Sequence, residues 1–534
     1  MHHALRVLRL ILRGGRPEDG PSRRGAASRS ALHLLWLGWA AALATGAVAQ
    51  QAVPPVVNVD GGALRGERLA DRVAFRGVPF AAPPVGPLRW RAPAPVREWK
   101  GVREATRSAP SCAQLDDGWN RDNAAGSVED CLYLDVASPT LTPERPMPVM
   151  VWIHGGSNKA GGAAGTVSTS MVRRGIVVVA IQYRLGPLGF LTHPALSAES
   201  PARGSGNYGL MDQQAALRWV RRNIARFGGD PAQVTIAGES AGAMDVALHQ
   251  VAPASRGLFR AAIQESGTAS FGHAARTVAQ GEAIGEALVA QAGHPRATAA
   301  VLRAIPVADL LQASRQIEQS GRFDPGTIWI QAQVDGTVIT EPPAATLTGK
   351  RGALVPLLIG SNAREIDFFN TPAGARAALP GNWGADAGRV ARLYGLDRPT
   401  APADDQVRGP VALQVATDAV FTCPTRFNAD ARVAAGVPVW RYDFTYQPVG
   451  GPPLSHASEL RYTFGNAGED NIPTDAPRLQ AYWANFIRSS DPNGEGLVRW
   501  NAYAPNRSYL RFGAGQPEQG VGLRDDICRD WDRP

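Results

Sequence analysis

A serine flanked by glycines follows a short apolar run and could act as a nucleophile. Ser240 is the centre of the motif Gly-Glu-Ser-Ala-Gly at residues 238–242, after the strand-like residues 234–237. A plausible helix begins near residue 243. A sharp strand-to-helix turn of this kind exposes a serine hydroxyl at the carboxyl edge of an α/β sheet. A hydroxyl is a weak nucleophile until a base removes its proton, so the motif predicts a catalytic histidine elsewhere in the chain.

Four histidines follow Ser240, and they are the candidates for that base because this fold orders its residues serine, acid, histidine. His249 falls within the helix expected after the serine, and His273 leaves no room for an intervening strand and acid. His294 stands at an expected helix end before a proline. His456 follows the strand-like residues 439–444 and is the predicted base by elimination, with a surface histidine as the alternative.

The acid that orients such a histidine is predicted at the end of another strand. Glu365 comes soon after the apolar residues 354–359, at a strand end where α/β enzymes collect catalytic groups. Asp367 is the second candidate, and sequence order alone does not separate the two carboxylates.

Backbone amides are predicted to stabilise the negative charge that develops on the substrate carbonyl. The residues His-Gly-Gly-Ser at 154–157 follow the apolar residues 149–153, as the oxyanion loop of esterases does. The amides of Gly156 and Ser157, together with that of Ala241 next to the nucleophile, are the predicted donors.

The elements that must position these residues indicate an α/β fold with a central, mostly parallel sheet flanked by helices. Continuous apolar runs, rather than alternating ones, are typical of strands buried on both faces. These runs cover residues 149–153, 176–181, 234–237 and 354–359. Between the second and third, apolar residues recur at helical spacing from Leu217 to Phe227, and Gly228 ends the pattern. Residues 370–420 are rich in Ala, Pro and Gly and give no clear prediction.

The charge of the chain is concentrated in its first 49 residues. The chain of 534 residues has a net charge of +8, but residues 1–49 contain seven arginines against Glu18 and Asp19, a net of +5. The remaining residues carry a net charge of +3, and this small excess does not indicate a nucleic-acid-binding surface. An apolar stretch at 31–43 and small residues at 47–49 predict a signal peptide over 1–49 and one domain over 50–534.

The leader predicts export to the periplasm or the medium, with no stable membrane anchor after cleavage. A membrane anchor is the alternative, but the apolar stretch is short for a spanning helix. The long basic region before it is compatible with a twin-arginine signal or with a misassigned start codon. Four cysteines behind an export signal suggest two disulfides with three possible connectivities, at Cys112, Cys131, Cys423 and Cys528. No Cys/His cluster indicates a metal site.

Several separate blocks make the chain resemble the type-B carboxylesterases over nearly its whole length, from about Val57 to Trp531. The blocks are residues 75–81 (Phe-Arg-Gly-Val-Pro-Phe-Ala), 129–134 (Glu-Asp-Cys-Leu-Tyr-Leu), 207–213, 227–231, 360–365 and 456–465. The resemblance implies an α/β-hydrolase fold with long loop and helical insertions. It also favours Glu365 and His456 over the alternatives above.

The resemblance further implies the disulfides Cys112–Cys131 and Cys423–Cys528. Ser266 matches the family's serine near the acid, and Glu239 matches its buried glutamate beside the nucleophile. Both are expected to tune the site. Two places depart from the family: Ser157 and Asn158 replace a glycine and an aromatic residue, and Ile366 replaces a glycine. The first departure is expected to influence which ester is preferred.

The expected function is therefore hydrolysis of a small-molecule carboxylic ester through an acyl-enzyme on Ser240, with no cofactor. A lipase or amidase on the same triad is one alternative. A catalytically silent, cholinesterase-like binding protein is another, although such relatives usually lose a triad member and none is missing here. The sequence does not specify the oligomeric state.

Overall fold

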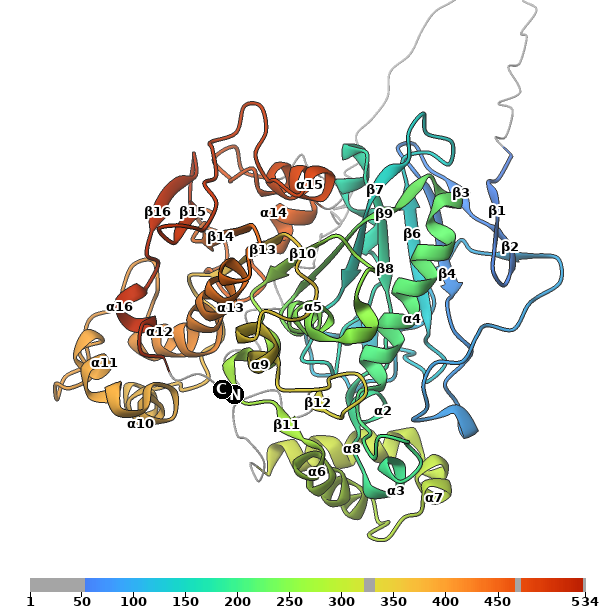
Figure 1. Ribbon diagram of the computed structural model, residues 1–534, viewed down its shortest axis with the longest axis horizontal. Helices are drawn as coiled ribbons and strands as arrows, with labels where there is room; N and C mark the ends of the chain where they lie inside the picture. The colour runs from blue at the N-terminus through green and yellow to red at the C-terminus, as the bar shows by residue number, and fades with distance from the viewer. Residues whose placement is uncertain (1–52, 321–331, 466–471, 532–534) are drawn as a thin grey trace, which may run out of the picture. The chain divides into compact units, whose positions relative to one another are not determined.

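Eleven strands form one mixed sheet in the part of the chain that the structure describes, which is residues 53–320, 332–465 and 472–531 of a computed structural model (Figure 1). The strand order is β16-β15-β14-β13-β10-β9-β7-β8-β6-β4-β3, and the seven strands from β15 to β8 are parallel to their neighbours within that group. Antiparallel strands complete both ends. The predicted leader, residues 1–49, lies outside the described residues.

The strands of the large sheet have the following bounds: β3 Glu67–Arg68, β4 Val73–Pro79, β6 Tyr133–Ser138, β7 Met147–Ile153, β8 Val177–Ile181, β9 Gly229–Glu239, β10 Ala261–Glu265, β13 Leu357–Asn362, β14 Val439–Phe444, β15 Ser508–Phe512 and β16 Glu518–Val521. Smaller sheets join β1 Val56–Val59, β2 Gly62–Arg65 and β5 Val102–Glu104, and β11 Arg276–Thr277 with β12 Gln333–Val334.

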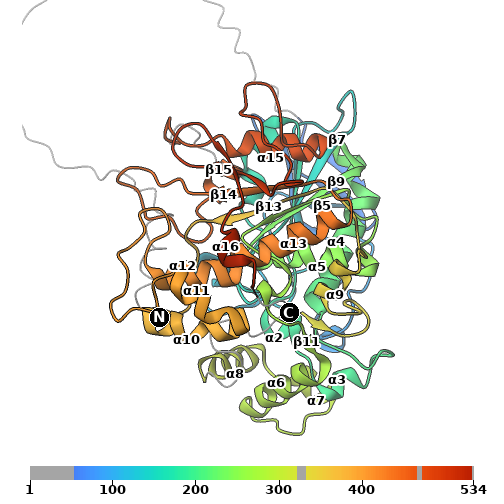
Figure 2. The ribbon, with the colours of Figure 1, turned by 60° about the vertical axis from the view of Figure 1, so that its left-hand side comes forward.

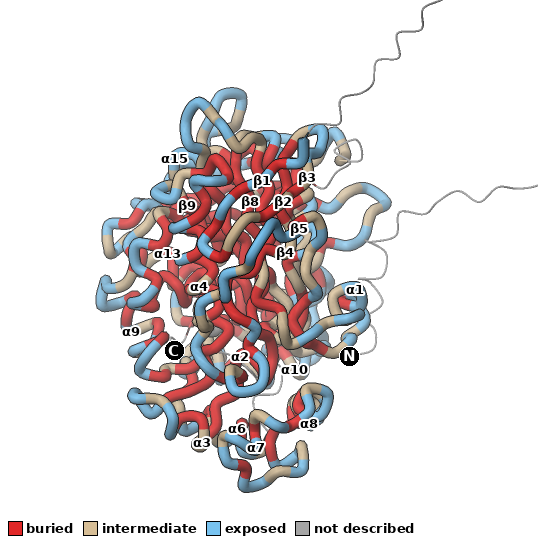
Figure 3. The backbone as a smooth tube through the Cα atoms, turned by 90° about the vertical axis from the view of Figure 1, so that its right-hand side faces the viewer, coloured by how far each residue is buried: buried red, intermediate tan, exposed pale blue. Residues whose placement is uncertain are grey.

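The continuous apolar runs are buried strands because both faces of the sheet are covered by helices. In β7, Val149 and Val151 belong to one core cluster, whereas Met150 and Trp152 belong to the other. Helices α4 Tyr208–Asn223, α5 Ala241–Val251 and α13 Cys423–Ala434 pack on the first face, and α15 Leu479–Ser489 packs on the second (Figures 1 and 2). Figure 3 shows the buried backbone concentrated along the strands.

Most predicted boundaries are close to the observed ones, but β9 begins at Gly229, five residues before the run predicted at 234–237, and β13 begins later than predicted. The run at 354–359 begins as a strand only at Leu357, because Pro356 has no N–H for the ladder and Leu354 is half exposed. The strand then continues to Asn362. The helical stripe from Leu217 to Phe227 is fully buried, and it ends in a turn of 3₁₀ helix closed by Gly228 in the left-handed region.

Helical insertions follow the strands that carry the site. The helices α6 Val278–Gln291, α7 Ala299–Ala304, α8 Val307–Gln319 and α9 Pro343–Thr348 lie between β10 and β13 in the chain. Between β13 and β14 are α10 Pro372–Trp383, α11 Ala387–Leu393, α12 Val411–Thr417, the π-helical turn Asp418–Thr422, and α13. Residues 370–420, which gave no clear prediction, are thus largely helical.

The other short helices are α1 Arg121–Ala124, α2 Gly186–Phe190, α3 Pro194–Ser197, α14 Leu460–Phe464 and α16 Asp525–Cys528. Among the described residues, no helix is both long enough and apolar enough to cross a membrane.

Candidate active site

Ser240 occupies a tight turn between β9 and α5. Its backbone has φ 55° and ψ −125°. This conformation costs a non-glycine residue free energy, and residues that adopt such conformations cluster at functional sites. A Cβ on Gly242 would lie 2.1 Å from the Ile153 carbonyl oxygen, and a Cβ on Gly267 would lie 2.3 Å from that of Ser240. Only glycine therefore allows the neighbouring strands to approach the turn this closely.

His456 lies in the loop after β14 and contacts Glu365 in the loop after β13. The His456 Nδ1 atom is 2.5 Å from Glu365 Oε2, so its N–H donates to the carboxylate and leaves Nε2 available as a base. Glu365 is held in turn, because its Oε1 accepts the Asn362 amide at 2.7 Å and its own amide donates to Thr417 Oγ1. The structure thus brings together the predicted base and the predicted acid.

The alternatives to these two residues lie elsewhere. Asp367 Oδ1 accepts the amides of Phe369 and Asn370, so this carboxylate closes a local turn. His249 is fully buried within α5, and His294 follows the end of α6.

The second imidazole nitrogen of His456 faces Glu239, the residue before Ser240. His456 Nε2 lies 3.1 Å from Glu239 Oε1, without the angle of a hydrogen bond. A hydrogen bond between Ser240 Oγ and His456 is not found among the described residues. In free enzymes the catalytic hydrogen bonds are often long or misaligned and tighten only when substrate binds.

Four buried glutamates surround this histidine, and we call Glu239, Glu265, Glu365 and Glu459 the carboxylate cluster. Glu459 accepts hydrogen bonds from Asn362 Nδ2 at 2.6 Å and from Ser266 Oγ at 3.4 Å. The Ser266 hydroxyl therefore reaches the acid indirectly, through Glu459. Glu265 accepts from the indole of Trp483 at 3.1 Å and from the Thr463 hydroxyl at 3.2 Å. Sequence reasoning assigned no role to Glu265 or Glu459.

The carboxylate cluster changes the proton affinity of the histidine. Burial alone would lower the pKa of His456, but the charges of Glu239 and Glu365 outweigh it and raise this pKa to about 9. Burial raises the pKa of Glu239 to about 8 and that of Glu459 to about 7. His456 and Glu239 compete for the same proton, so they titrate as a pair.

The loop at residues 154–161 contains two of the predicted oxyanion donors, and we call it the oxyanion loop. It approaches Ser240 from the end of β7. A Cβ on Gly155 would lie 3.0 Å from that of Ser240, which indicates direct contact between the loop and the turn. The amides of Gly156 and Ser157 donate to no other protein group within the described ranges. Ala241 is the first residue of α5, and its amide has no acceptor within the helix. These three N–H groups are available to a bound oxyanion.

The two residues that depart from the family pattern have different environments. Ser157 is partly exposed, and its backbone has φ 58°. Asn158 is fully buried, and its Nδ2 donates to Asp245 Oδ1 at 3.1 Å. The expectation that these residues influence ester preference stays a prediction for Ser157, whereas the Asn158 side chain points into the protein toward Asp245.

A disulfide-closed segment also holds the oxyanion loop. Cys112 is bonded to Cys131, and between them Gln114 exchanges two hydrogen bonds of 2.8 Å with the backbone of Gly161. The ring of Trp119, in the same segment, would lie 3.0 Å from a Cβ on Gly156. The second disulfide joins Cys423 to Cys528. The pairs are the ones that the family resemblance implies.

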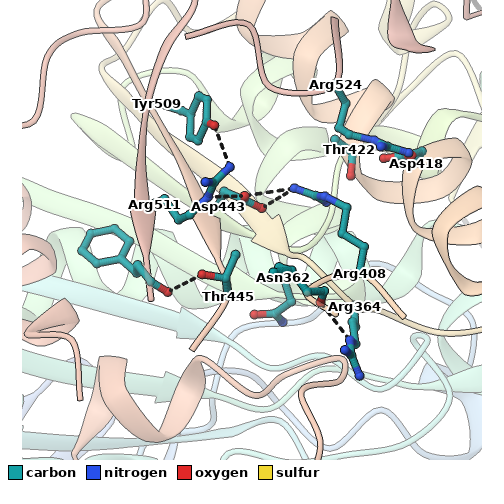
Figure 4. Close-up of polar contacts among 12 residues, drawn as sticks. Asn362, Arg364, Arg408, Asp418, Thr422, Asp443, Thr445, Tyr509, Arg511 and Arg524 are labelled. Atoms are coloured by element: carbon teal, nitrogen blue, oxygen red, sulfur yellow. Dashed lines mark hydrogen bonds and ion pairs between the residues drawn. The ribbon is translucent and has the colours of Figure 1, made fainter. Parts of the chain in front are cut away.

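Buried ion pairs fix the strand that leads to His456 (Figure 4). Asp443 on β14 is almost fully buried and accepts from Arg408 at 3.0 and 3.2 Å and from Arg511 at 3.3 Å. In the π-helical turn, Asp418 pairs with Arg524. Removing one partner of such a pair leaves an unpaired buried charge, which destabilises the fold around these segments.

Comparison with known proteins gives matches over nearly the whole chain. The sequence model of the Carboxylesterase family matches residues 53–531. Fumonisin B1 esterase of Sphingopyxis macrogoltabida is 34% identical over 541 residues, which cover 96% of this chain and 97% of that protein. Liver carboxylesterase 1 of Oryctolagus cuniculus is 31% identical, with 92% of this chain and 96% of that protein covered.

Solved structures agree with these sequence matches. A PNB esterase superimposes with a TM-score of 0.76 at 31% identity, covering 89% of this chain and 99% of that chain. The carboxylesterase EST55 of Geobacillus stearothermophilus at pH 6.2 gives a TM-score of 0.76 at 30% identity, covering 89% and 100%.

Proposed function

The chain belongs to the carboxylesterase family and is a carboxylic-ester hydrolase, and from that premise we propose that Ser240, His456 and Glu365 perform the reaction. The observation that carries this assignment is the 2.5 Å contact between His456 Nδ1 and Glu365 Oε2, beside a serine held in a strained turn. It fixes the tautomer in which Nε2 can accept a proton.

The proposed mechanism has two acyl-transfer steps. Ser240 Oγ attacks the ester carbonyl carbon while His456 Nε2 takes the hydroxyl proton, and the carbonyl oxygen becomes an oxyanion. The amides of Gly156, Ser157 and Ala241 donate to that oxyanion, a contribution that typically reaches a few kcal/mol. His456 then protonates the departing alcohol and leaves an acyl group on Ser240.

Water completes the cycle. His456 takes a proton from a water molecule while the water oxygen attacks the acyl carbon. A second oxyanion then forms in the same place. Its collapse breaks the bond to Ser240 Oγ, which regains its proton from His456, and the carboxylic acid is released. Glu365 stabilises the imidazolium that forms in both steps. Glu239 and Ser266 act indirectly, through the proton affinity and placement of His456 and Glu459.

Replacing Ser240 tests the assignment. We expect Ser240→Ala to hydrolyse p-nitrophenyl butyrate at least about 10⁴-fold more slowly than the wild type, because the residual rate comes from binding and the oxyanion donors alone. His456→Ala should lose a comparable factor. His294→Ala is the control, since His294 lies away from the carboxylate cluster, and it should keep wild-type activity. Wild-type turnover in Ser240→Ala would contradict the proposal.

We also propose that the protein is exported after removal of residues 1–49, to the periplasm or the medium. Two disulfides support this, because such bonds persist in oxidising compartments. Expression of the full chain in a Gram-negative host should give an extracytoplasmic protein. Its intact mass should equal that of a chain that begins at Gln50. A protein that stays in the cytoplasm with uncleaved residues 1–49 would overturn this proposal.

A further inference from the structure

A carboxyl group that the proposed mechanism does not use lies one helical turn behind the oxyanion donor Ala241. Asp245 is fully buried on α5, four residues after Ala241 and therefore on the same face of the helix. Its Oδ2 accepts from Gln213 Nε2 at 2.6 Å, and its Oδ1 accepts from Asn158 Nδ2 at 3.1 Å. A buried carboxyl needs such donors, and burial raises the pKa of Asp245 to about 7.

The other end of this contact belongs to the oxyanion loop. Ser157 and Asn158 are consecutive residues in the left-handed region, with φ 58° and 54°, so this turn of the loop is strained. The surrounding contacts must hold it. The Asn158 carbonyl accepts the Gly186 amide at 2.6 Å, and the Tyr183 hydroxyl lies 3.1 Å from Asn158 Oδ1 and 2.7 Å from the His154 carbonyl oxygen.

The orientation of Asp245 is fixed from behind. Gln213 Oε1 lies 2.7 Å from His249 Nε2, and His249 Nδ1 lies 2.9 Å from the Ser255 hydroxyl. Because Gln213 uses its amide N–H on Asp245, its oxygen accepts from His249, and Nδ1 accepts from Ser255. Burial lowers the pKa of His249 to about 3, so the imidazole stays neutral and keeps this role.

We propose that Asn158 and Asp245 are positioning residues that set the spacing between the two halves of the oxyanion hole. One half is the Ala241 amide at the start of α5, and the other is the pair of amides on the loop at Gly156 and Ser157. The Asn158–Asp245 hydrogen bond joins the element that carries the first half to the element that carries the second. This inference rests on the proposed function, because it assumes that these amides bind the oxyanion.

Removing the tether should weaken transition-state binding more than substrate binding. For Asn158→Ala we expect kcat on p-nitrophenyl butyrate to fall about 10- to 100-fold with KM within about threefold, since small displacements of oxyanion donors cost rate. The Ki of an aryl trifluoromethyl ketone, which forms a tetrahedral oxyanion on serine, should rise by the same factor. The Ki of the matching methyl carbinol, which forms no oxyanion, should stay within about twofold.

A matched control separates this role from a loss of stability. Asn223 is also a fully buried asparagine whose Nδ2 donates to an aspartate, Asp60, at 3.1 Å. Asn223→Ala should lower Tm as Asn158→Ala does, but leave kcat and the ketone Ki within about twofold of wild type. Asn158→Ser, whose hydroxyl is too short to reach Asp245, serves where Asn158→Ala does not fold and should show the same catalytic loss.

A double-mutant comparison tests whether Asn158 acts through Asp245. In the background of Asp245→Ala, Asn158→Ala should reduce kcat by less than about threefold further, because the contact is already lost. Wild-type kcat and ketone Ki in folded Asn158→Ala and Asn158→Ser would overturn the inference. Failure of the proposed function is distinguishable, because the wild type itself would then not form the ketone adduct on Ser240.

Discussion

Two buried polar networks meet at Ser240, and they are built from different groups. The carboxylate cluster around His456 contains four glutamates, and its negative charge raises the pKa of the histidine. The tether behind the oxyanion loop contains one carboxyl, Asp245, surrounded by amides and a neutral histidine. The first network acts on a proton, whereas the second acts on distances between backbone amides.

This difference predicts that the carboxylate cluster and the Asn158–Asp245 tether respond differently to substitution. Electrostatic effects on His456 extend over several ångströms in a buried site, so Glu239, Glu365 and Glu459 all contribute to its proton affinity. Hydrogen-bond donors must lie about 2.7–3.1 Å from the oxyanion, so the tether acts only through geometry. Variants of the first network should therefore change the pKa of His456, and variants of the second should change transition-state affinity.

Among variants of the two networks, the largest effect is expected for Glu365, the proposed acid. Glu365→Gln removes the charge that stabilises the imidazolium and permits the wrong tautomer of His456, so kcat should fall about 10⁴-fold. The measurement is steady-state hydrolysis of p-nitrophenyl butyrate. Asp367→Asn is the matched control, because Asp367 only closes a turn, and it should stay within about threefold of wild type. Equal losses in the two variants would contradict the distinction.

A pH profile distinguishes the two networks. The charge of Glu239 favours the protonated form of His456, so removing it in Glu239→Gln lowers the pKa of His456. The unprotonated base is then present at lower pH, and the acid limb of kcat/KM should move to lower pH. Asn158→Ala should leave that limb in place while lowering the plateau. A shift of the acid limb in both variants, or in neither, would contradict the distinction between the two networks.

The two disulfides should differ in their effect on activity. Cys112–Cys131 closes the segment whose Gln114 holds Gly161 of the oxyanion loop. Replacing both cysteines with serine should lower kcat/KM roughly fivefold to tenfold, on the scale of misplaced oxyanion donors. Replacing Cys423 and Cys528 should lower Tm, since that bond closes a longer stretch of chain, but leave kcat/KM within about twofold. A larger loss of kcat/KM on replacing Cys423 and Cys528 than on replacing Cys112 and Cys131 would contradict this prediction.

The smallest effect is expected at Ser157. Ser157 is partly exposed and is itself a predicted oxyanion donor, so Ser157→Gly removes a side chain near the expected substrate position without removing an amide. We expect relative kcat/KM values to change by about threefold across a panel of short aliphatic, aryl, hydroxycinnamoyl and polycarboxylate esters. An unchanged ranking of the panel would show that Ser157 does not influence ester preference.

The sequence predicted the elements that local patterns encode. The turn at Ser240 follows from its strand, its glycines and the helix after it, and the buried strands follow from their apolar runs. The β13 boundary was predicted three residues early, because the apolar run extends through Pro356 although a proline cannot join the ladder.

The contacts across the fold were less accessible. The sequence places Asn158 in a loop that is expected to face the substrate. Its side chain is nevertheless buried against Asp245, 87 residues away in the chain. Likewise Glu265 and Glu459 join the carboxylate cluster from β10 and from the turn before α14. Glu459 stands in the family-like block 456–465, but no local pattern predicts that either glutamate lies in this cluster. Burial and proton affinity depend on neighbours that only the folded chain brings together.

Covalent labelling tests the central assignment most directly. We expect a fluorophosphonate to add one phosphonyl group to the wild-type protein. Peptide mass mapping should place this group on Ser240, and activity should fall in proportion to labelling. Ser240→Ala should remain unlabelled. An active protein that is labelled at another residue, or that is not labelled at all, would contradict Ser240 as the nucleophile.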